Sequence, residues 1–115
     1  MARRIEQVND LIRGELGKII DRDIDLPDRS LLTVTRVITS SDLHYADVYF
    51  CVMPHTNETA ALETLTKRIG GIQKALNRKL RMRPVPRIKF VLDVEQKRAD
   101  RIEKLLAGER LKNVE

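Results

Sequence analysis

Residues 31–53, LLTVTRVITSSDLHYADVYFCVM, contain two runs rich in β-branched and aromatic residues, separated by residues that favour turns. In the second run Ala46, Val48 and Phe50 occupy alternate positions, so one side of a strand can face a hydrophobic core. Pro54 follows this run and stops it. The pattern predicts an antiparallel β-hairpin.

Helical periodicity precedes and follows the hairpin. Residues 4–21 predict an amphipathic helix. Asn57 is a candidate N-cap for a later helix, and the glycines at 70–71 divide its apolar pattern into a kinked pair. Residues 87–93 alternate as a third strand, and residues 94–106 predict a last helix. The core side of the first helix is predicted to comprise Ile5, Val8, Leu11, Ile12, Leu16, Ile19 and Ile20.

The order α-β-β-α-kink-α-β, with a C-terminal helix, predicts an α+β fold. Helices would cover one face of a three-stranded sheet in a two-layer sandwich. A chain of 115 residues is one domain, which we place at residues 1–108, with residues 109–115 as a frayed tail. No apolar run approaches the roughly 20 residues of a membrane span, and the N-terminus has no signal-peptide core. We expect a cytoplasmic monomer.

Positive charge is concentrated in one part of the sequence. Residues 64–92 contain nine basic residues and no Asp or Glu, whereas the net charge of the whole chain is only +5. Charge of one sign on one segment indicates an anionic partner. Nucleic acid is the commonest such partner, and an anionic membrane surface is the other candidate.

A helical wheel gives the basic segment a geometry. Lys74, Arg78 and Arg81 fall opposite the apolar stripe, together with Lys67. Like charges one turn apart repel by a few tenths of a kcal/mol, so an anion that relieves the repulsion is indicated. The predicted phosphate-binding set is Lys74, Arg78, Arg81, Lys67, Arg68, Lys79, Arg83, Arg87 and Lys89.

The kind of nucleic acid follows from the aromatic content. The chain has two Tyr, two Phe and no Trp, and none is predicted on the basic side of the helix. Base-stacking platforms are therefore disfavoured, and contacts to the phosphates of a structured RNA are favoured.

Catalytic and metal sites have little support. Cys51, His44 and His55 are too few and too scattered for a zinc site, and no metal or other cofactor is expected. A Cys51–His55 nucleophile pair lacks a third orienting group, so Cys51 is interpreted as an inert strand residue. The segment 21–32 begins like a calcium loop but lacks its glycine and its bidentate Glu.

A G-x-x-G motif at residues 14–17 lies inside the first predicted helix. Such motifs clamp phosphates when they form a loop. Because these glycines lie in a helix, we attribute them to close helix packing.

Three blocks in order resemble the bacterial ribosome-binding factor A family over most of residues 4–106. They are TVTRVITSSDLHYADVYF at 33–50, LNRKLRMRPVPRIKFVLD at 76–93 and RIEKLL at 101–106. The resemblance implies a type II KH fold in which a kink between two helices replaces the usual GXXG loop. It also implies a non-catalytic factor that binds ribosomal RNA of the immature small ribosomal subunit near the head–body neck. Such a factor would assist late maturation and processing of that RNA.

Two departures from the family pattern concern local geometry. Residues 68–70 read Arg-Ile-Gly where the family often has an Ala-x-Gly kink. In the connection after the first predicted helix, Asp28 is inserted between Pro27 and Arg29, which the family pattern has side by side. Two other classes of protein remain as alternatives. One is an adaptor that docks an acidic protein on the basic surface, and the other is a small hydrolase that uses Cys51 and His55.

Overall fold

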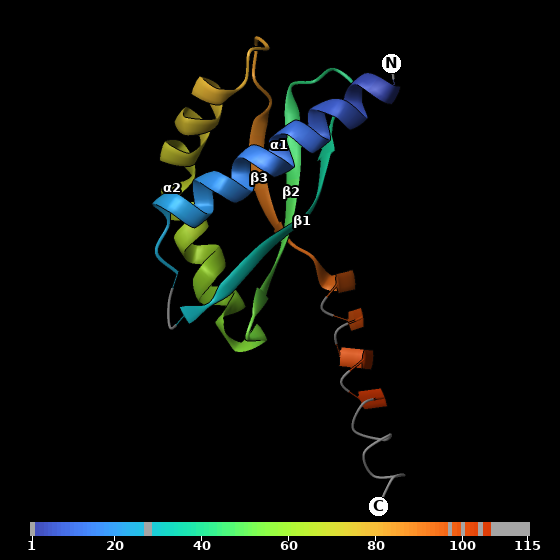
Figure 1. Ribbon diagram of the computed structural model, residues 1–115, viewed down its shortest axis with the longest axis vertical. Helices are drawn as coiled ribbons and strands as arrows, with labels where there is room; N and C mark the ends of the chain where they lie inside the picture. The colour runs from blue at the N-terminus through green and yellow to red at the C-terminus, as the bar shows by residue number, and fades with distance from the viewer. Residues whose placement is uncertain (1, 27–28, 97, 100, 104, 107–115) are drawn as a thin grey trace, which may run out of the picture.

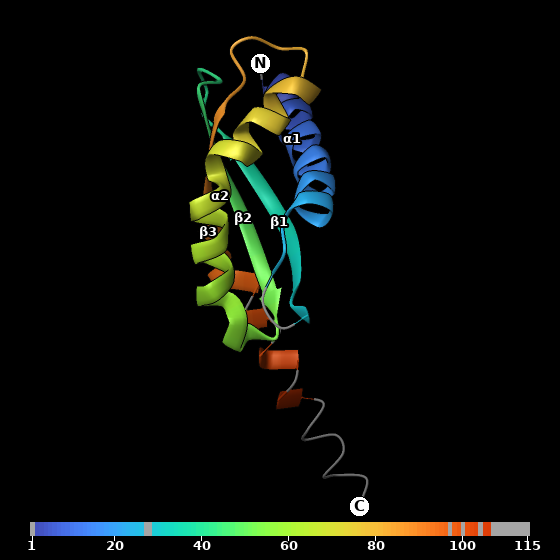
Figure 2. The ribbon, with the colours of Figure 1, turned by 90° about the vertical axis from the view of Figure 1, so that its left-hand side faces the viewer.

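The hairpin predicted from residues 31–53 supplies two of the three strands. The computed structural model describes residues 2–26, 29–96, 98–99, 101–103 and 105–106. Its elements are α1 (Ala2–Asp23), β1 (Leu31–Thr39), β2 (Tyr45–Met53), η2 (His55–Asn57), α2 (Glu58–Lys79) and β3 (Arg87–Leu92). The sheet order is β1-β2-β3, with β1 antiparallel and β3 parallel to β2. Both helices lie over one face of the sheet, which confirms the predicted α+β sandwich (Figures 1 and 2).

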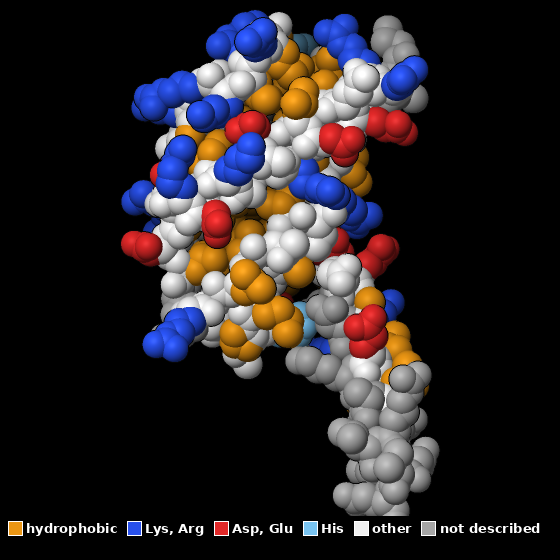
Figure 3. Space-filling view, in the orientation of Figure 1, with side chains coloured by type: hydrophobic (Ala, Val, Ile, Leu, Met, Phe, Trp, Pro, Cys, Tyr) orange, Lys and Arg blue, Asp and Glu red, His pale blue; other side chains and the backbone are white. Residues whose placement is uncertain are grey.

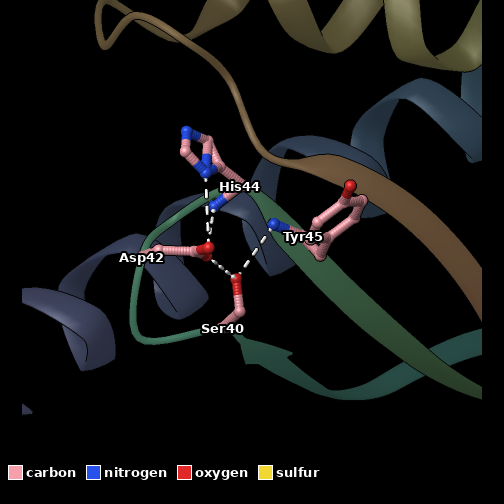
Figure 4. A network of polar contacts seen from close by, with 4 residues as sticks. All are labelled: Ser40, Asp42, His44 and Tyr45. Atoms are coloured by element: carbon pink, nitrogen blue, oxygen red, sulfur yellow. Dashed lines mark hydrogen bonds and ion pairs between the residues drawn. The ribbon is translucent and has the colours of Figure 1, made fainter.

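The turn between β1 and β2 is held by a small polar network (Figure 4). The Asp42 carboxylate accepts hydrogen bonds from the Ser40 hydroxyl at 2.6 Å and from the backbone N–H of His44 at 3.1 Å. Ser40 Oγ in turn accepts the backbone N–H of Tyr45 at 3.0 Å. The hydrogen bond from Ser40 is the largest cause of the lowered pKa of Asp42. Local hydrogen bonds of this kind fix where β2 begins.

The core lies between the sheet and the two helices. Phe50 is fully buried on β2 and meets Phe90 of β3 edge-on, with ring centroids 6.3 Å apart. The α1 stripe is largely as predicted. Its buried members are Val8, Ile12, Leu16, Ile19 and Ile20.

Two expectations for α1 are wrong. Leu11 is 55% exposed, because it lies at the edge of the stripe beside a surface cleft. Gly14 and Gly17 do not serve close packing, since a Cβ atom on either would meet no heavy atom within 4 Å. Both glycines are exposed positions of the helix.

The predicted pair of helices after η2 is a single helix. α2 continues through Gly70 and Gly71 without interruption, because glycine weakens a helix but keeps its backbone donor. Figure 2 shows that the helix axis bends between its green and gold halves. Asn57 holds the N-cap position without a side-chain capping bond, and its amide instead donates to Ser30 Oγ at 2.8 Å.

The strand predicted at residues 87–93 is β3, with Ile88 and Phe90 buried. The described residues between 94 and 106 are helical, as predicted, and extend away from the sandwich (Figure 1). Their large apolar side chains do not join the core: Val94, Ile102, Leu105 and Leu106 are all exposed. The expected domain boundary at residue 108 and the tail at 109–115 lie outside the described residues.

Asp93 links the end of β3 to β1. Its buried carboxylate accepts the Thr35 hydroxyl at 2.6 Å and the backbone N–H of Gln96 at 3.1 Å, and Arg36 Nε lies 3.7 Å away. Burial is the largest single influence and raises the pKa of Asp93. The hydrogen bonds from Thr35 and Gln96 and the charge of Arg36 together outweigh it, so the pKa lies below its ordinary value.

A lowered pKa makes the contribution of Asp93 pH-dependent. The stabilisation is complete above the pKa of the unfolded chain, about 3.9, and is lost as the pH falls through the lower folded value. We expect Asp93→Asn to reduce the free energy of unfolding at about pH 7 by roughly 1–3 kcal/mol. The variant should also lose less stability than the wild type on acidification.

Urea unfolding of both proteins, from about pH 7 to below the unfolded-state pKa of about 3.9, measures the effect. Asp10→Asn, at an exposed carboxylate of α1, is the control and should change the free energy at about pH 7 by less than about 0.5 kcal/mol. Parallel pH profiles for the wild type and Asp93→Asn would contradict the assignment.

Candidate nucleic-acid interface

All nine basic residues predicted to bind phosphate are exposed, but they lie on three different elements. We call the five on the helix the α2 basic surface: Lys67, Arg68, Lys74, Arg78 and Lys79. Arg81 and Arg83 lie in the loop after α2, and Arg87 and Lys89 lie on β3. Figure 3 shows Lys and Arg side chains gathered over the upper half of α2 and at the adjoining end of the molecule.

Arg81 is not on the helix where the wheel placed it. α2 ends at Lys79, and Leu80 is already extended, with φ −92° and ψ 138°. The buried Leu80 side chain anchors this change of direction. Arg81 therefore extends the basic surface past the end of the helix and does not stack on Arg78 one turn below.

Arg87 and Lys89 face away from α2. Because side chains alternate along a strand, they project from the face of the sheet opposite to Ile88 and Phe90. In the register of the sheet, Arg87 pairs with Tyr45 of β2, an aromatic side chain that is 61% exposed. The prediction about aromatic residues concerned the basic side of the helix and does not cover this face of the sheet, where Tyr45 is exposed.

The open sheet face also carries a contact between a cation and an aromatic ring. Arg36 Cζ lies 4.1 Å from the ring centroid of Tyr49, within cation–π range, and Arg36 also pairs with Asp93. Its charge is thereby partly neutralised. Arg87 and Lys89 thus lie in a smaller area, separate from the α2 basic surface, where Lys89 pairs in register with the acidic Asp47.

Electrostatics distinguish the α2 basic surface from an ordinary charged helix. Among the residues that the structure describes, no ion pair includes any of its five members. Arg78 and Lys79 also suit the negative end of the helix dipole, which explains their sign without a ligand. Lys67 and Lys74 lie further from that end and have no such explanation.

Arg68 is partly balanced by a carboxylate on α1. The pKa of Asp23 is lowered chiefly by the hydrogen bond from Arg22, and Arg68 contributes a smaller share across the cleft between the helices. Arg68 is accordingly the least available member of the α2 basic surface.

Gln73 fixes the loop that carries Arg81 and Arg83. Its amide oxygen accepts the Ile88 N–H at 2.9 Å, and its amide nitrogen donates to the Pro86 carbonyl at 3.1 Å. Arg83 is itself engaged, since Nη1 donates to the carbonyls of Leu80 and Met82 at 2.8 and 2.7 Å. We infer that Arg83 holds the loop in place as well as adding charge.

Arg4 is a further basic residue beside the candidate interface, and the sequence alone did not single it out. It lies in the first turn of α1 and lines a cleft together with Lys79 and Arg81. One signal could have drawn attention to it. Cations at a helix N-terminus oppose the helix dipole, so the adjacent Arg3 and Arg4 there call for another explanation.

The other candidates, Cys51 and His55, lie on consecutive elements. Cys51 lies half-buried on β2, and His55 lies in η2 after that strand. Within the described part of the chain, no three His, Cys, Asp or Glu side chains are placed to share a metal ion. Over the same residues, no helix is long and apolar enough to cross a membrane.

The architecture is that of a type II KH-like domain with an uncovered sheet face and a cationic helix. The family model described as ribosome-binding factor A matches residues 4–106. Ribosome-binding factor A of Chlamydia pneumoniae is 41% identical over 107 residues, which cover 90% of this chain and 89% of that protein. The chain therefore belongs to the ribosome-binding factor A family.

Solved structures agree with this membership. The crystal structure of ribosome-binding factor A from Thermus thermophilus superposes with a TM-score of 0.66 at 29% identity, covering 76% of this chain and 94% of that one. A second structure is a homology model of the Thermus thermophilus protein, fitted into a cryo-electron microscopy map of a 30S–RbfA complex. It gives a TM-score of 0.61 at 30% identity, covering 72% of this chain and 88% of that one.

The glycines at the bend of α2 can be tested by stability. A Cβ on Gly70 or Gly71 meets no heavy atom within 4 Å, and both positions are exposed. We expect the double substitution Gly70→Ala/Gly71→Ala to raise the free energy of unfolding by about 1 kcal/mol per glycine, measured in urea. Ala60→Gly, at an exposed position of the same helix, should lower it by a similar amount. A decrease for the double variant would show that the packing of α2 on the sheet requires the glycines.

Proposed function

We propose that this protein is a non-catalytic assembly factor that binds ribosomal RNA of the immature small ribosomal subunit and assists its late maturation and processing. The observation that carries the proposal is the α2 basic surface, whose exposed cations have no ion-pair partner among the described residues. Membership of the family and the placement of a Thermus thermophilus relative in a 30S complex support the choice of partner.

The chemistry of the surface favours RNA phosphates over base edges. Lys74 and Arg78 are separated by one helical turn, so they can contact successive phosphates along a backbone. Such contacts give affinity and salt dependence with little sequence readout. Recognition would then depend on the shape of the folded RNA. The exposed loop residue Arg81 continues the contact line, and Arg87 and Lys89 are proposed as a separate, peripheral area.

Charge reversal on α2 tests the proposal. We expect Lys74→Glu/Arg78→Glu to weaken binding to purified free small subunits at least about tenfold at moderate salt. Since each lost phosphate contact lowers the salt slope of binding by about 1, the slope should fall by about 2. Co-sedimentation over a series of salt concentrations measures both quantities.

A matched control separates this surface from net charge. Arg13→Glu/Lys18→Glu makes the same charge change at exposed positions of α1 and should keep wild-type binding. Equal weakening by both double variants, or unchanged binding by the α2 variant, would contradict the proposal. Binding that survives nuclease removal of the RNA would instead support the adaptor alternative.

A further inference from the structure

An open cleft of about 390 Å³ lies between the start of α1 and the end of α2. Its apolar lining consists of Val8, Leu11, Leu80 and Met82. Leu11 is 55% exposed there, which leaves an apolar side chain at the surface for a ligand to cover. In Figure 3, hydrophobic side chains at the top of the molecule are flanked by Lys and Arg.

The rim of the cleft is cationic. Arg4, Lys79 and Arg81 line it together with Gln7, and none of the described residues that line it is acidic. All three cations are exposed, so their charges are available to a ligand. A cleft with an apolar floor and a positively charged rim fits a ligand that is flat and apolar in one part and anionic in another.

We propose that this cleft holds one unstacked base of a single-stranded RNA segment, with the adjoining phosphate held by Lys79 and Arg81. The inference rests on the proposed RNA-binding function and adds a base-binding subsite to it. A nucleobase offers apolar faces to Leu11 and Met82, and guanidinium planes such as that of Arg4 stack on bases. The Gln7 amide both donates and accepts hydrogen bonds, as the edge of a base requires.

Continuity with the α2 basic surface favours RNA over an acidic peptide. Lys79 belongs to both the helix surface and the cleft rim, so a strand on α2 reaches the cleft without a break. The volume is at the small end of ligand sites, about 300–1,000 Å³, which suits one base and its ribose. A base inside a duplex remains stacked and cannot enter, so the site selects single-stranded RNA.

The test compares an oligouridylate of about eight nucleotides with an abasic strand of the same length, using fluorescence anisotropy on the full chain. The two strands carry the same phosphates and differ only in their bases. We expect the wild type to bind the abasic strand about tenfold more weakly. Leu11→Glu should bind the two strands equally, because the cleft no longer accepts a base. Leu31→Glu, at an apolar residue 65% exposed at the start of β1, should discriminate as the wild type does.

Each other outcome overturns the subsite. Equal binding of both strands by the wild type would show that the cleft holds no base and that only phosphates are bound. This comparison needs no variant. Discrimination that persists in Leu11→Glu, with circular dichroism showing a folded chain, would place the base elsewhere. An acidic, Leu-containing peptide that binds more tightly than oligouridylate and is lost in Leu11→Glu would assign the cleft to a protein. Failure of both strands to bind would count against the proposed function itself.

Discussion

The parallel pairing of β3 with β2 is the constraint on which the arrangement of the molecule depends. A chain leaving β2 at Met53 must travel back along the sheet before it can begin β3 at Arg87. β2 has nine residues and rises about 30 Å, while the 22 residues of α2 rise about 33 Å. One helix of this length is enough to bring the chain back along the sheet, and α2 accordingly continues through Gly70 and Gly71 without a break.

This return places several distant segments at one end of the sandwich. The end of α2, the start of β3 and the hairpin turn meet there, and the Arg87 N–H donates to the His44 carbonyl at 2.8 Å. The first turn of α1 reaches the same end, as its shared cleft with Lys79 shows. Residues from the beginning and the middle of the sequence thereby form one positive end, although only the middle segment is free of acids.

Much of the fold could be predicted because its signals are local. The alternation in β2 identifies the buried side at Val48 and Phe50, and the periodicity of α1 identifies most of its core stripe. The end of α2 was harder, because a wheel assumes that the helix continues. Here the extended backbone of Leu80 is determined by tertiary contacts, including those of Gln73 with the next strand.

The candidate site was only partly accessible from the sequence. Helical spacing groups Lys74 with Arg78, but a period of two residues cannot say that Arg87 and Lys89 lie on the far face of the sheet. That depends on which side of β3 the helices cover. Only the three-dimensional structure places Arg4 near the candidate site, because Arg4 is about 75 residues from Lys79 in sequence and lies across a cleft from it.

The order of charges along α2 has a consequence for how the molecule meets a partner. Glu58 and Glu63 lie in the first turns of the helix, Lys67 and Arg68 lie near its middle, and Lys74, Arg78 and Lys79 lie towards its C-terminal end. Whole charges separated over this length give the side chains a dipole moment larger than that of the backbone, which amounts to about half a charge at each end. The field of a polyanion would turn the approaching protein so that the C-terminal end of α2 leads. Such pre-orientation affects the rate of encounter and fades when the screening length shortens to about 8 Å at physiological ionic strength.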